Sequence, residues 1–286
     1  MIVLDFFYLT TLPAFALPTV QPIAMEIAPA PDFTAPLTVL YRDADLVAVY
    51  KPAGWLVHRS AIARHEKRFV LQRLRDQIGQ HVWPVHRLDQ GTCGLLVFAL
   101  HKESCQQLAQ AFATQQVQKT YLALARGWLL DTTHVDYPLC PEDSAPDAPP
   151  QDAQTTLHGL ATLDWPESYD PRHPSTRASL VLARPHTGRR HQIRRHLKHV
   201  AHPILGDATH GKGPLNRWWA ERLGGQRLWL HAHALELPHP RTGEPLALCA
   251  DWRQLAHVPE VQQWQQMLRL PGWQGLEQLP PSCGAL

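Results

Sequence analysis

The stretch HRLDQGTCGLLVFAL, residues 86 to 100, joins a charged turn to an apolar strand. Its second half has the length and composition of a buried strand, and two glycines permit a tight turn before it. Asp89 in such a turn commonly caps its own loop, but the neighbouring His86 and Arg87 are not needed for a cap. A carboxylate beside an apolar strand is costly unless it is paired, and an arginine partner would keep it ionised. Asp89 is therefore a candidate nucleophile or general base.

Further strands and helices are predicted on both sides of this stretch. Apolar runs bounded by turn residues predict strands, and apolar residues at helical spacing predict helices. Strands outnumber helices and often follow one another too closely for helical crossovers, so we predict an α+β fold with a central mixed, mostly antiparallel sheet and flanking helices. The predicted strands are 37–41, 46–52, 94–100, 118–127, 158–165, 176–185 and 226–237, and the predicted helices are 69–79, 102–116, 188–200 and 260–270.

The composition is that of a globular protein. Of 286 residues, 44% are hydrophobic and 18% charged, so the chain can bury a substantial core. The five cysteines are odd in number and show no CxxC spacing, which favours reduced thiols in a cytoplasmic protein. Residues 138–156 are rich in Pro, Asp and Ala and predict a flexible surface insertion.

The first 20 residues are apolar, which raises the question of a signal peptide or a membrane span. No Lys or Arg precedes Arg42, and prolines interrupt the run, so both are disfavoured. Regular patterning begins near Leu37. We therefore predict a flexible extension over 1–36, which is dispensable over roughly its first 30 residues, and one folded domain over 37–286.

Residues 183–203 (ARPHTGRRHQIRRHLKHVAHP) carry many cations and no acidic residue. On a helix their apolar residues form one buried stripe, with Arg190 and Arg194 at its border and His191 and Arg195 pointing away. A border arginine can pair with a buried carboxylate, whereas outward cations meet solvent or phosphate. Charge runs are usually solvated faces, but this density without acidic neighbours favours a polyanionic partner. The cations are Arg184, Arg189, Arg190, Arg194, Arg195 and Lys198.

Four histidines in this segment, His191, His196, His199 and His202, invite comparison with a metal site. No Cys, Asp or Glu stands close to them in the sequence, and structural zinc takes four ligands, so we predict no metal. The chain also lacks P-loop, GxGxxG, HExxH and GxSxG patterns. No second motif carboxylate accompanies Asp89, which disfavours the paired-carboxylate chemistry of glycosidases.

The quoted stretch resembles the HRLDxxTSGLLVFAK signature of the RluA-type pseudouridine synthases. Three further stretches fall in that family's order: VAVYKPAGWLVH (47–58), QKTYLALARG (118–127) and HTGRRHQIRRHL (186–197). Cys93 stands where serine is usual, and we expect it to pack rather than to react. The resemblance implies the family's α+β fold, with a cleft across the sheet, and a catalytic domain over 37–286.

The resemblance also implies roles for single residues. Asp89 matches the catalytic aspartate, and Tyr121 matches the tyrosine that packs on the target uracil and can transfer a proton there. Arg194 matches the arginine that pairs with the aspartate, and Arg87 matches the one that holds the flipped nucleotide or fills its gap. The family reaction breaks the C1′–N1 bond of uridine and rejoins the turned uracil through C5, without cofactor or metal. RNA contacts are expected from Arg87, His86, Arg190, Arg189, Arg195 and Lys198.

Within this family, the stretches KPAGWLVHRS, RDQIGQHV, QRLWLHA and GWQGL look most like the branch that acts on uridine 65 of tRNA. We therefore predict a cytoplasmic RNA pseudouridine synthase with tRNA as its partner. We expect a monomer that binds no membrane and needs no obligate protein partner. Two alternatives stay open, namely a ribosomal-RNA synthase of the same family and a non-catalytic RNA-binding protein of this fold. The complete set of Asp89, Tyr121 and Arg194 argues against the second alternative.

Overall fold

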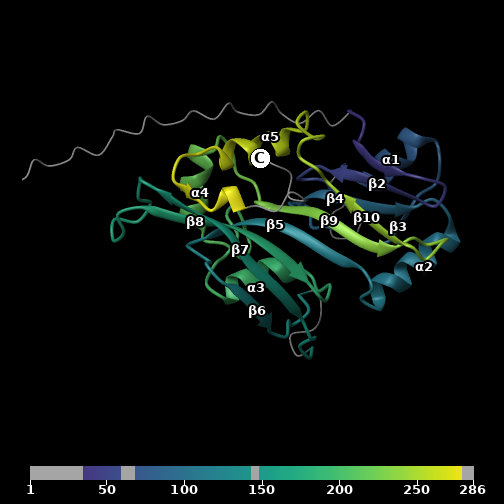
Figure 1. The fold of residues 1–286 in the computed structure, drawn as a ribbon, viewed down its shortest axis with the longest axis horizontal. Coiled ribbons are helices and arrows are strands. Elements are labelled where there is room, and N and C mark those ends of the chain that lie inside the picture. Colours follow the sequence, from purple (N-terminus) through teal and green to yellow (C-terminus); the bar gives the residue numbers. More distant parts are fainter. Residues whose placement is uncertain (1–34, 59–67, 143–147, 279–286) are drawn as a thin grey trace, which may run out of the picture.

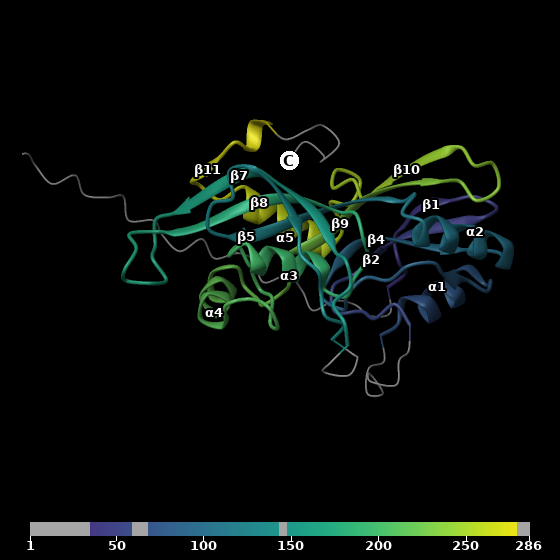
Figure 2. The same ribbon diagram turned by 90° about the horizontal axis from the view of Figure 1, so that it is seen from below.

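The computed structural model describes residues 35–58, 68–142 and 148–278, which form one twisted sheet with helices packed against it (Figures 1 and 2). The helices are α1 (Val70–Ile78), α2 (Lys102–Ala113), α3 (Gln192–His199), α4 (Gly213–Arg222) and α5 (Pro259–Leu268), followed by the 3₁₀ helix η2 (Leu276–Gln278). The strands are β1 (Val39–Arg42), β2 (Leu46–Lys51), β3 (Trp83–Pro84), β4 (Cys93–Ala99), β5 (Gln118–Arg126), β6 (Thr132–Asp136), β7 (Gln154–Trp165), β8 (Thr176–Pro185), β9 (Leu230–Pro238), β10 (Pro245–Cys249) and β11 (Trp273–Gln274).

The sheet places the turn that carries Asp89 near its middle. Its main path runs β1-β2-β4-β9-β5-β8-β7-β11, and the one parallel pairing among the described strands joins β4 to β9. Gly94, on β4, has a φ of 114°, and a Cβ atom there would lie 2.2 Å from the carbonyl oxygen of Ala232 on β9. Glycine is therefore required where these strands meet, a few residues after the Asp89 turn.

Helices cover both faces of the first half of the sheet. Every residue of β2 and β4 is buried, and successive side chains enter opposite faces. On one face, Val70 and Leu74 of α1 pack against Val47 and Phe98. On the other face, α2 packs on β3, β4 and β9. This burial on both sides explains the continuous apolar runs of β2 and β4.

The basic segment predicted to be a helix packs on the second half of the sheet. Helix α3 contacts β7 and β8, and Figure 2 shows it crossing beneath these strands. Ile193 and Leu197 are buried, as the apolar stripe predicts, and Arg194 is buried with them. A short turn, residues 186–191, joins the end of β8 to the start of α3.

The predicted fold class is confirmed, and each predicted strand and helix has a counterpart with shifted ends. The helix predicted over 188–200 begins only at Gln192, because His191 adopts a left-handed φ of 53° that ends the turn before it. The segment 138–156 is not a flexible insertion throughout. Leu139 pairs with Gln151, Ala153 is fully buried, and residues 154–156 open β7, while residues 143–147 lie outside the described part.

Some elements were not predicted from the sequence, namely α4 and the short strands β3, β6, β10 and β11. The predicted extension over 1–36 lies outside the described residues, except for its last two positions. Within the described ranges, no helix is both long and apolar enough to cross a bilayer.

Candidate active site

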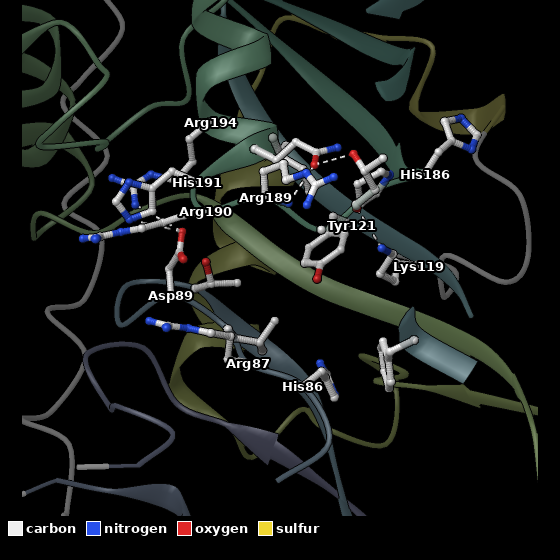
Figure 3. A pocket seen from close by; sticks show the side chains of 18 of the residues that line it. His86, Arg87, Asp89, Lys119, Tyr121, His186, Arg189, Arg190, His191 and Arg194 are labelled. Atoms are coloured by element: carbon white, nitrogen blue, oxygen red, sulfur yellow. Dashed lines mark hydrogen bonds and ion pairs between the residues drawn. The ribbon is translucent and has the colours of Figure 1, made fainter. Parts of the chain in front are cut away.

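A pocket of about 620 Å³ opens where the Asp89 turn, β5 and the turn after β8 meet (Figure 3). Figure 3 shows Asp89 beside His191 and Arg190, with the ring of Tyr121 in the middle of the pocket. Among the described residues that line it, Asp89 is the one acid. Five cations line the same pocket: Arg87, Lys119, Arg189, Arg190 and Arg194. The pocket therefore combines a single carboxylate with a strongly positive wall, an arrangement suited to a polyanion.

Arg194 holds Asp89 from the first turns of α3. Its Nη1 donates to Asp89 Oδ2 over 3.1 Å, while its Nε and Nη2 donate to Asp207 Oδ2 and Oδ1 over 2.7 and 2.8 Å. The side chain of Arg194 is only 9% exposed, that of Asp207 is 0% exposed, and that of Asp89 is 22% exposed. Asp207 thus fixes the guanidinium bidentately, and the remaining nitrogen holds the Asp89 carboxylate in place.

Asp207 is itself fixed by the turn that carries it. Its Oδ1 accepts the backbone N–H groups of Thr209 and His210, each over 2.9 Å. Burial alone would raise the pKa of Asp207, but the hydrogen bonds from Arg194 and these N–H groups outweigh it and hold the pKa below its usual value. The preceding Gly206 has a φ of 73°, and a Cβ there would lie 1.6 Å from the carbonyl oxygen of Arg227. Only glycine fits this turn.

Lys51, at the end of β2, is hydrogen-bonded to the turn that carries Asp89. Its side chain is fully buried, and its Nζ donates to the carbonyl oxygens of Pro52 and Gln90 over 2.8 and 3.1 Å. The Gln90 oxygen also accepts the N–H of Gly54 over 2.8 Å. Burial lowers the pKa of Lys51 to about 7. The stretch VAVYKPAGWLVH thus contributes the support of the turn next to Asp89 rather than a group that lines the pocket.

Tyr121 presents a neutral phenol to the pocket. It lies on β5 at a register shift in the pairing with β9, and its hydroxyl has no hydrogen-bond partner among the described residues. Burial, and then the charge of Asp89, raise the pKa of Tyr121 well above its usual value. The ring is therefore uncharged near neutral pH and offers a flat surface and an O–H group within the pocket.

The predicted substrate-binding residues divide into two sets. Arg87, Arg189, Arg190 and His86 line the pocket, and Arg87 is exposed without a partner in the described part of the chain. Arg190 lies in the turn before α3 and not on the helix, so its predicted place at the border of the apolar stripe is wrong.

Arg195 and Lys198 do not line the pocket. Arg195 Nη1 donates to the carbonyl oxygen of Cys140 over 2.8 Å, and Lys198 is exposed in the last turn of α3. The structure therefore separates these two cations from Asp89 and leaves them on the outer side of the helix.

His86 has a structural role that the sequence did not indicate. Its Nε2 accepts the N–H of Val97 over 3.0 Å, and its ring stacks on Phe112. Burial, and then the charge of Lys119, lower the pKa of His86 to about 3. It is therefore a neutral acceptor that joins the Asp89 turn to β4.

Four residues that matter to the site were not singled out from the sequence as partners of Asp89. Asp207 lies 118 positions from Asp89 along the chain, and neither it nor Lys51 carries a local signal of pairing. Lys119 lines the pocket, donates to the carbonyl oxygen of Thr187 over 2.8 Å, and has its pKa lowered to about 8 by burial. His191, predicted to point away, instead lies with Nε2 3.9 Å from Asp89 Oδ2, because it precedes the helix in a left-handed conformation.

Gln192 ties the turn before α3 to the sheet. Its Oε1 accepts the Thr187 hydroxyl and the Arg189 N–H over 2.7 and 2.9 Å. Its Nε2 donates to the carbonyl oxygen of Gln154 and the hydroxyl of Thr155 over 2.9 and 3.0 Å. All the polar capacity of this buried amide is used, so the turn that carries Arg189, Arg190 and His191 is rigidly placed.

Comparison with known proteins bears on this site. Residues 45–199 match the family described as RNA pseudouridylate synthase. The protein named tRNA pseudouridine synthase C of Salmonella typhi is 47% identical over 247 residues, which cover 84% of this chain and 92% of that protein. The proteins of the same name from Pasteurella multocida and Haemophilus influenzae are 46% and 44% identical, covering 83% and 84% of this chain and 97% and 100% of their own lengths.

Two solved human structures share the fold. RNA Pseudouridylate Synthase Domain Containing 1 superimposes with a TM-score of 0.63 at 23% identity, covering 85% of this chain and 99% of its own. RNA Pseudouridylate Synthase Domain Containing 4 gives a TM-score of 0.56 at 27% identity, covering 75% of this chain and 88% of its own.

Proposed function

Because this chain belongs to the RNA pseudouridylate synthase family, we propose that it isomerises one uridine of a tRNA to pseudouridine, with Asp89 as its catalytic carboxylate. The observation that carries the proposal is the pocket itself. Asp89 is the one acid among the described residues that line it, Arg194 donates a hydrogen bond to Asp89, and Tyr121 and several cations line the same pocket. A non-catalytic RNA-binding protein would have no need of a carboxylate that a buried arginine holds in such a place.

The isomerisation breaks the bond from C1′ to N1, turns the uracil, and forms a bond from C1′ to C5. The proton on C5 leaves, and N1 gains a proton, so the overall composition is unchanged. Asp89 can act by attack at C1′, by attack at uracil C6, or by removing the proton at C2′. Each route uses the Asp89 carboxylate, which the hydrogen bond from Arg194 holds in place. In this proposal the neutral hydroxyl of Tyr121 exchanges a proton with the turned base.

A stacked uridine cannot present C1′ to Asp89, so the nucleotide must leave its stack at a cost of a few kcal/mol. Phosphate contacts from the pocket cations would offset this cost. Arg87 is exposed at the pocket, and its guanidinium can stack on a base or fill the gap that the flipped nucleotide leaves. Arg195 and Lys198, on the outer side of α3, would add phosphate contacts farther along the RNA.

The names of the similar proteins favour tRNA as the substrate, and the sequence resemblance favours uridine 65. The test is tritium release from [5-³H]uridine-labelled RNA, because forming the C1′–C5 bond expels the hydrogen on C5. A tRNA transcript should release one equivalent, and the same transcript with cytidine at position 65 should release none. Release from the altered transcript would contradict position 65, and release from ribosomal RNA alone would contradict the tRNA assignment.

A further inference from the structure

Three metal-ligating side chains converge next to Asp89. His191 Nδ1 lies 2.9 Å from Glu142 Oε2 and 3.1 Å from His210 Nε2, and His210 Nε2 lies 3.3 Å from Glu142 Oε1. They come from three separate segments: the turn after β6, the turn before α3 and the turn after Asp207. This Glu142–His191–His210 cluster joins residues that the sequence alone did not connect, because Glu142 lies 49 positions before His191.

The spacing of these atoms suits a small tetrahedral metal ion. Zinc bonds of about 2.0–2.1 Å at tetrahedral angles place neighbouring ligand atoms roughly 3.3 Å apart. The three measured separations, 2.9 to 3.3 Å, lie at or slightly below this value, so little movement is needed to admit an ion. Two imidazoles and one carboxylate are the ligand set of open, three-ligand zinc sites, which leave a fourth position for water or another ligand.

The outer shell of the cluster also resembles that of a metal site. A metal-binding histidine usually directs its other ring nitrogen toward a carboxylate or a carbonyl group. His191 has Nδ1 toward Glu142 and Nε2 toward Asp89, whose Oδ2 is 3.9 Å away. His210 is anchored by its own backbone N–H to Asp207. The two histidines are therefore positioned independently of any contact that they make with each other.

The local charge permits a cation. The carboxylates of Asp89, Glu142 and Asp207 face two guanidinium groups, those of Arg190 and Arg194. Arg190 Nε forms an ion pair with Glu142 over 3.4 Å, so three carboxylates stand against two cations.

A second three-residue group shows the opposite situation. In the Asp43–Asp45–His239 group, Arg241 donates to both oxygens of Asp45 over 2.9 and 3.0 Å. Asp43 accepts the backbone N–H groups of Asp45 and Leu46 through one oxygen and the Tyr41 hydroxyl through the other. These carboxylates are already used, so this group serves as a control and not as a candidate.

We propose that Glu142, His191 and His210 bind one divalent transition-metal ion of the zinc class, and that the bound ion inhibits the enzyme. Because His191 would bridge the ion and Asp89, a bound ion would polarise its Nε2–H and draw the Asp89 carboxylate away from the substrate. The ion is not needed for the reaction. The inhibitory consequence rests on the proposed function, whereas the binding itself does not.

Binding is tested without any RNA. The full chain, freed of metal by dialysis against a chelator, is titrated with ZnCl₂ by calorimetry and with CoCl₂ by visible spectroscopy, since tetrahedral Co²⁺ has an intense d–d spectrum. One equivalent should bind. Glu142→Gln and His210→Gln should each raise the dissociation constant by more than about tenfold, because even outer-shell partners contribute about 10- to 100-fold in affinity. His239→Gln and Cys140→Ser should bind as the unchanged chain does.

Two results would overturn the site: no saturable binding by the unchanged chain, or binding that His210→Gln leaves intact. A thiolate charge-transfer band that disappears in Cys140→Ser would place the ion at the exposed Cys140 and also overturn it.

The inhibitory consequence is tested by tritium release from tRNA with and without one equivalent of Zn²⁺. His210→Gln, whose ring does not line the pocket, should keep its turnover and lose the inhibition. Binding without inhibition would refute the effect on Asp89. Absence of turnover in metal-free buffer would instead refute the proposed function and leave the binding result standing.

Discussion

Arg194 donates one hydrogen bond to Asp89 through Nη1, over 3.1 Å, and its Nε and Nη2 both donate to Asp207. The arginine therefore cannot turn away from Asp89 without breaking a buried bidentate ion pair. The orientation of the proposed catalytic carboxylate thus depends on Asp207, which does not line the pocket. The consequences can be measured at each of the three side chains.

Replacing Arg194 with alanine should destabilise the fold and impair the chemistry. Asp207 would be left buried without its cationic partner, and breaking a buried ion pair in this way typically costs about 3 to 5 kcal/mol. The single-turnover rate should fall, because Asp89 loses the hydrogen bond that orients its carboxylate. Arg194→Lys, which keeps the charge, should fold and show the same loss of single-turnover rate in weaker form.

Arg195→Ala is the matched control for Arg194→Ala. Arg195 lies one position along α3, outside the pocket, and donates to the Cys140 carbonyl oxygen. Its loss should therefore weaken tRNA binding modestly and reduce its salt dependence. Single-turnover rates at saturating enzyme separate the two variants. A slowed chemical step in Arg195→Ala, with normal chemistry in Arg194→Lys, would show that the helix is wrongly placed against the pocket.

Asp207→Asn should lower kcat much more than it changes KM. Asn cannot hold the guanidinium bidentately, so Arg194 and Asp89 lose their fixed orientation, and losing a charged hydrogen bond costs about 1.5 to 3 kcal/mol of stability. The pKa of Asp207 is lowered in the fold, so its contribution is full above roughly pH 4 and is lost as the pH falls through the lower folded value. Urea unfolding below pH 4 should therefore show a weaker pH dependence in the variant. An unchanged kcat would contradict a positioning role.

The acid stability of the fold should depend on His86. Its folded pKa of about 3 lies below the ordinary value of roughly 6.5, so the unfolded chain binds a proton that the folded chain excludes. Stability should be full above about pH 6.5 and should fall as the pH drops from there toward 3. His86→Gln, which keeps an acceptor, should flatten this dependence in urea denaturation between pH 7 and pH 5, whereas the exposed His173→Gln should not. Equal slopes for all three chains would refute the role of His86.

Lys119 should make tRNA affinity depend on pH. Burial lowers the pKa of Lys119 to about 8, so its charge is present at pH 7 and largely lost by about pH 9. If this ammonium contacts a phosphate in the pocket, the dissociation constant for tRNA should rise across this interval. Lys119→Arg, which stays charged, should remove that rise. A pH dependence that persists in Lys119→Arg would assign it to another group.

Local patterns were enough to predict the fold class, and the family resemblance, in agreement with the border position of Arg194, implied its pairing with Asp89. The residues that indicate a given strand or helix lie within about ten positions of one another along the chain. Strand β4, for example, is a continuous apolar run that follows a glycine turn. What the sequence concealed depends on distant segments. Asp207 reaches Arg194 only through a left-handed Gly206 turn, and Lys51 reaches the Gln90 carbonyl oxygen only because β2 pairs with β4.

Two errors have a common physical cause. Treating 188–200 as one regular helix gave wrong directions to Arg190 and His191, because a single residue with positive φ moves everything before it off the helix. His191 has a β-carbon, so nothing in the sequence marks it as left-handed. The next residue, Gln192, holds this turn through its side-chain hydrogen bonds, and a glutamine in a sequence does not by itself indicate a left-handed residue before it.

The most direct test of the account is the Asp89→Asn variant. Asn has nearly the same shape as Asp but no charge, so the fold, the thermal midpoint and most of the tRNA affinity should be retained. Tritium release from [5-³H]uridine-labelled tRNA, measured at saturating enzyme, should fall to background because no carboxylate remains to start the isomerisation. Release at an appreciable fraction of the unchanged rate by a folded Asp89→Asn protein would contradict Asp89 as the catalytic residue.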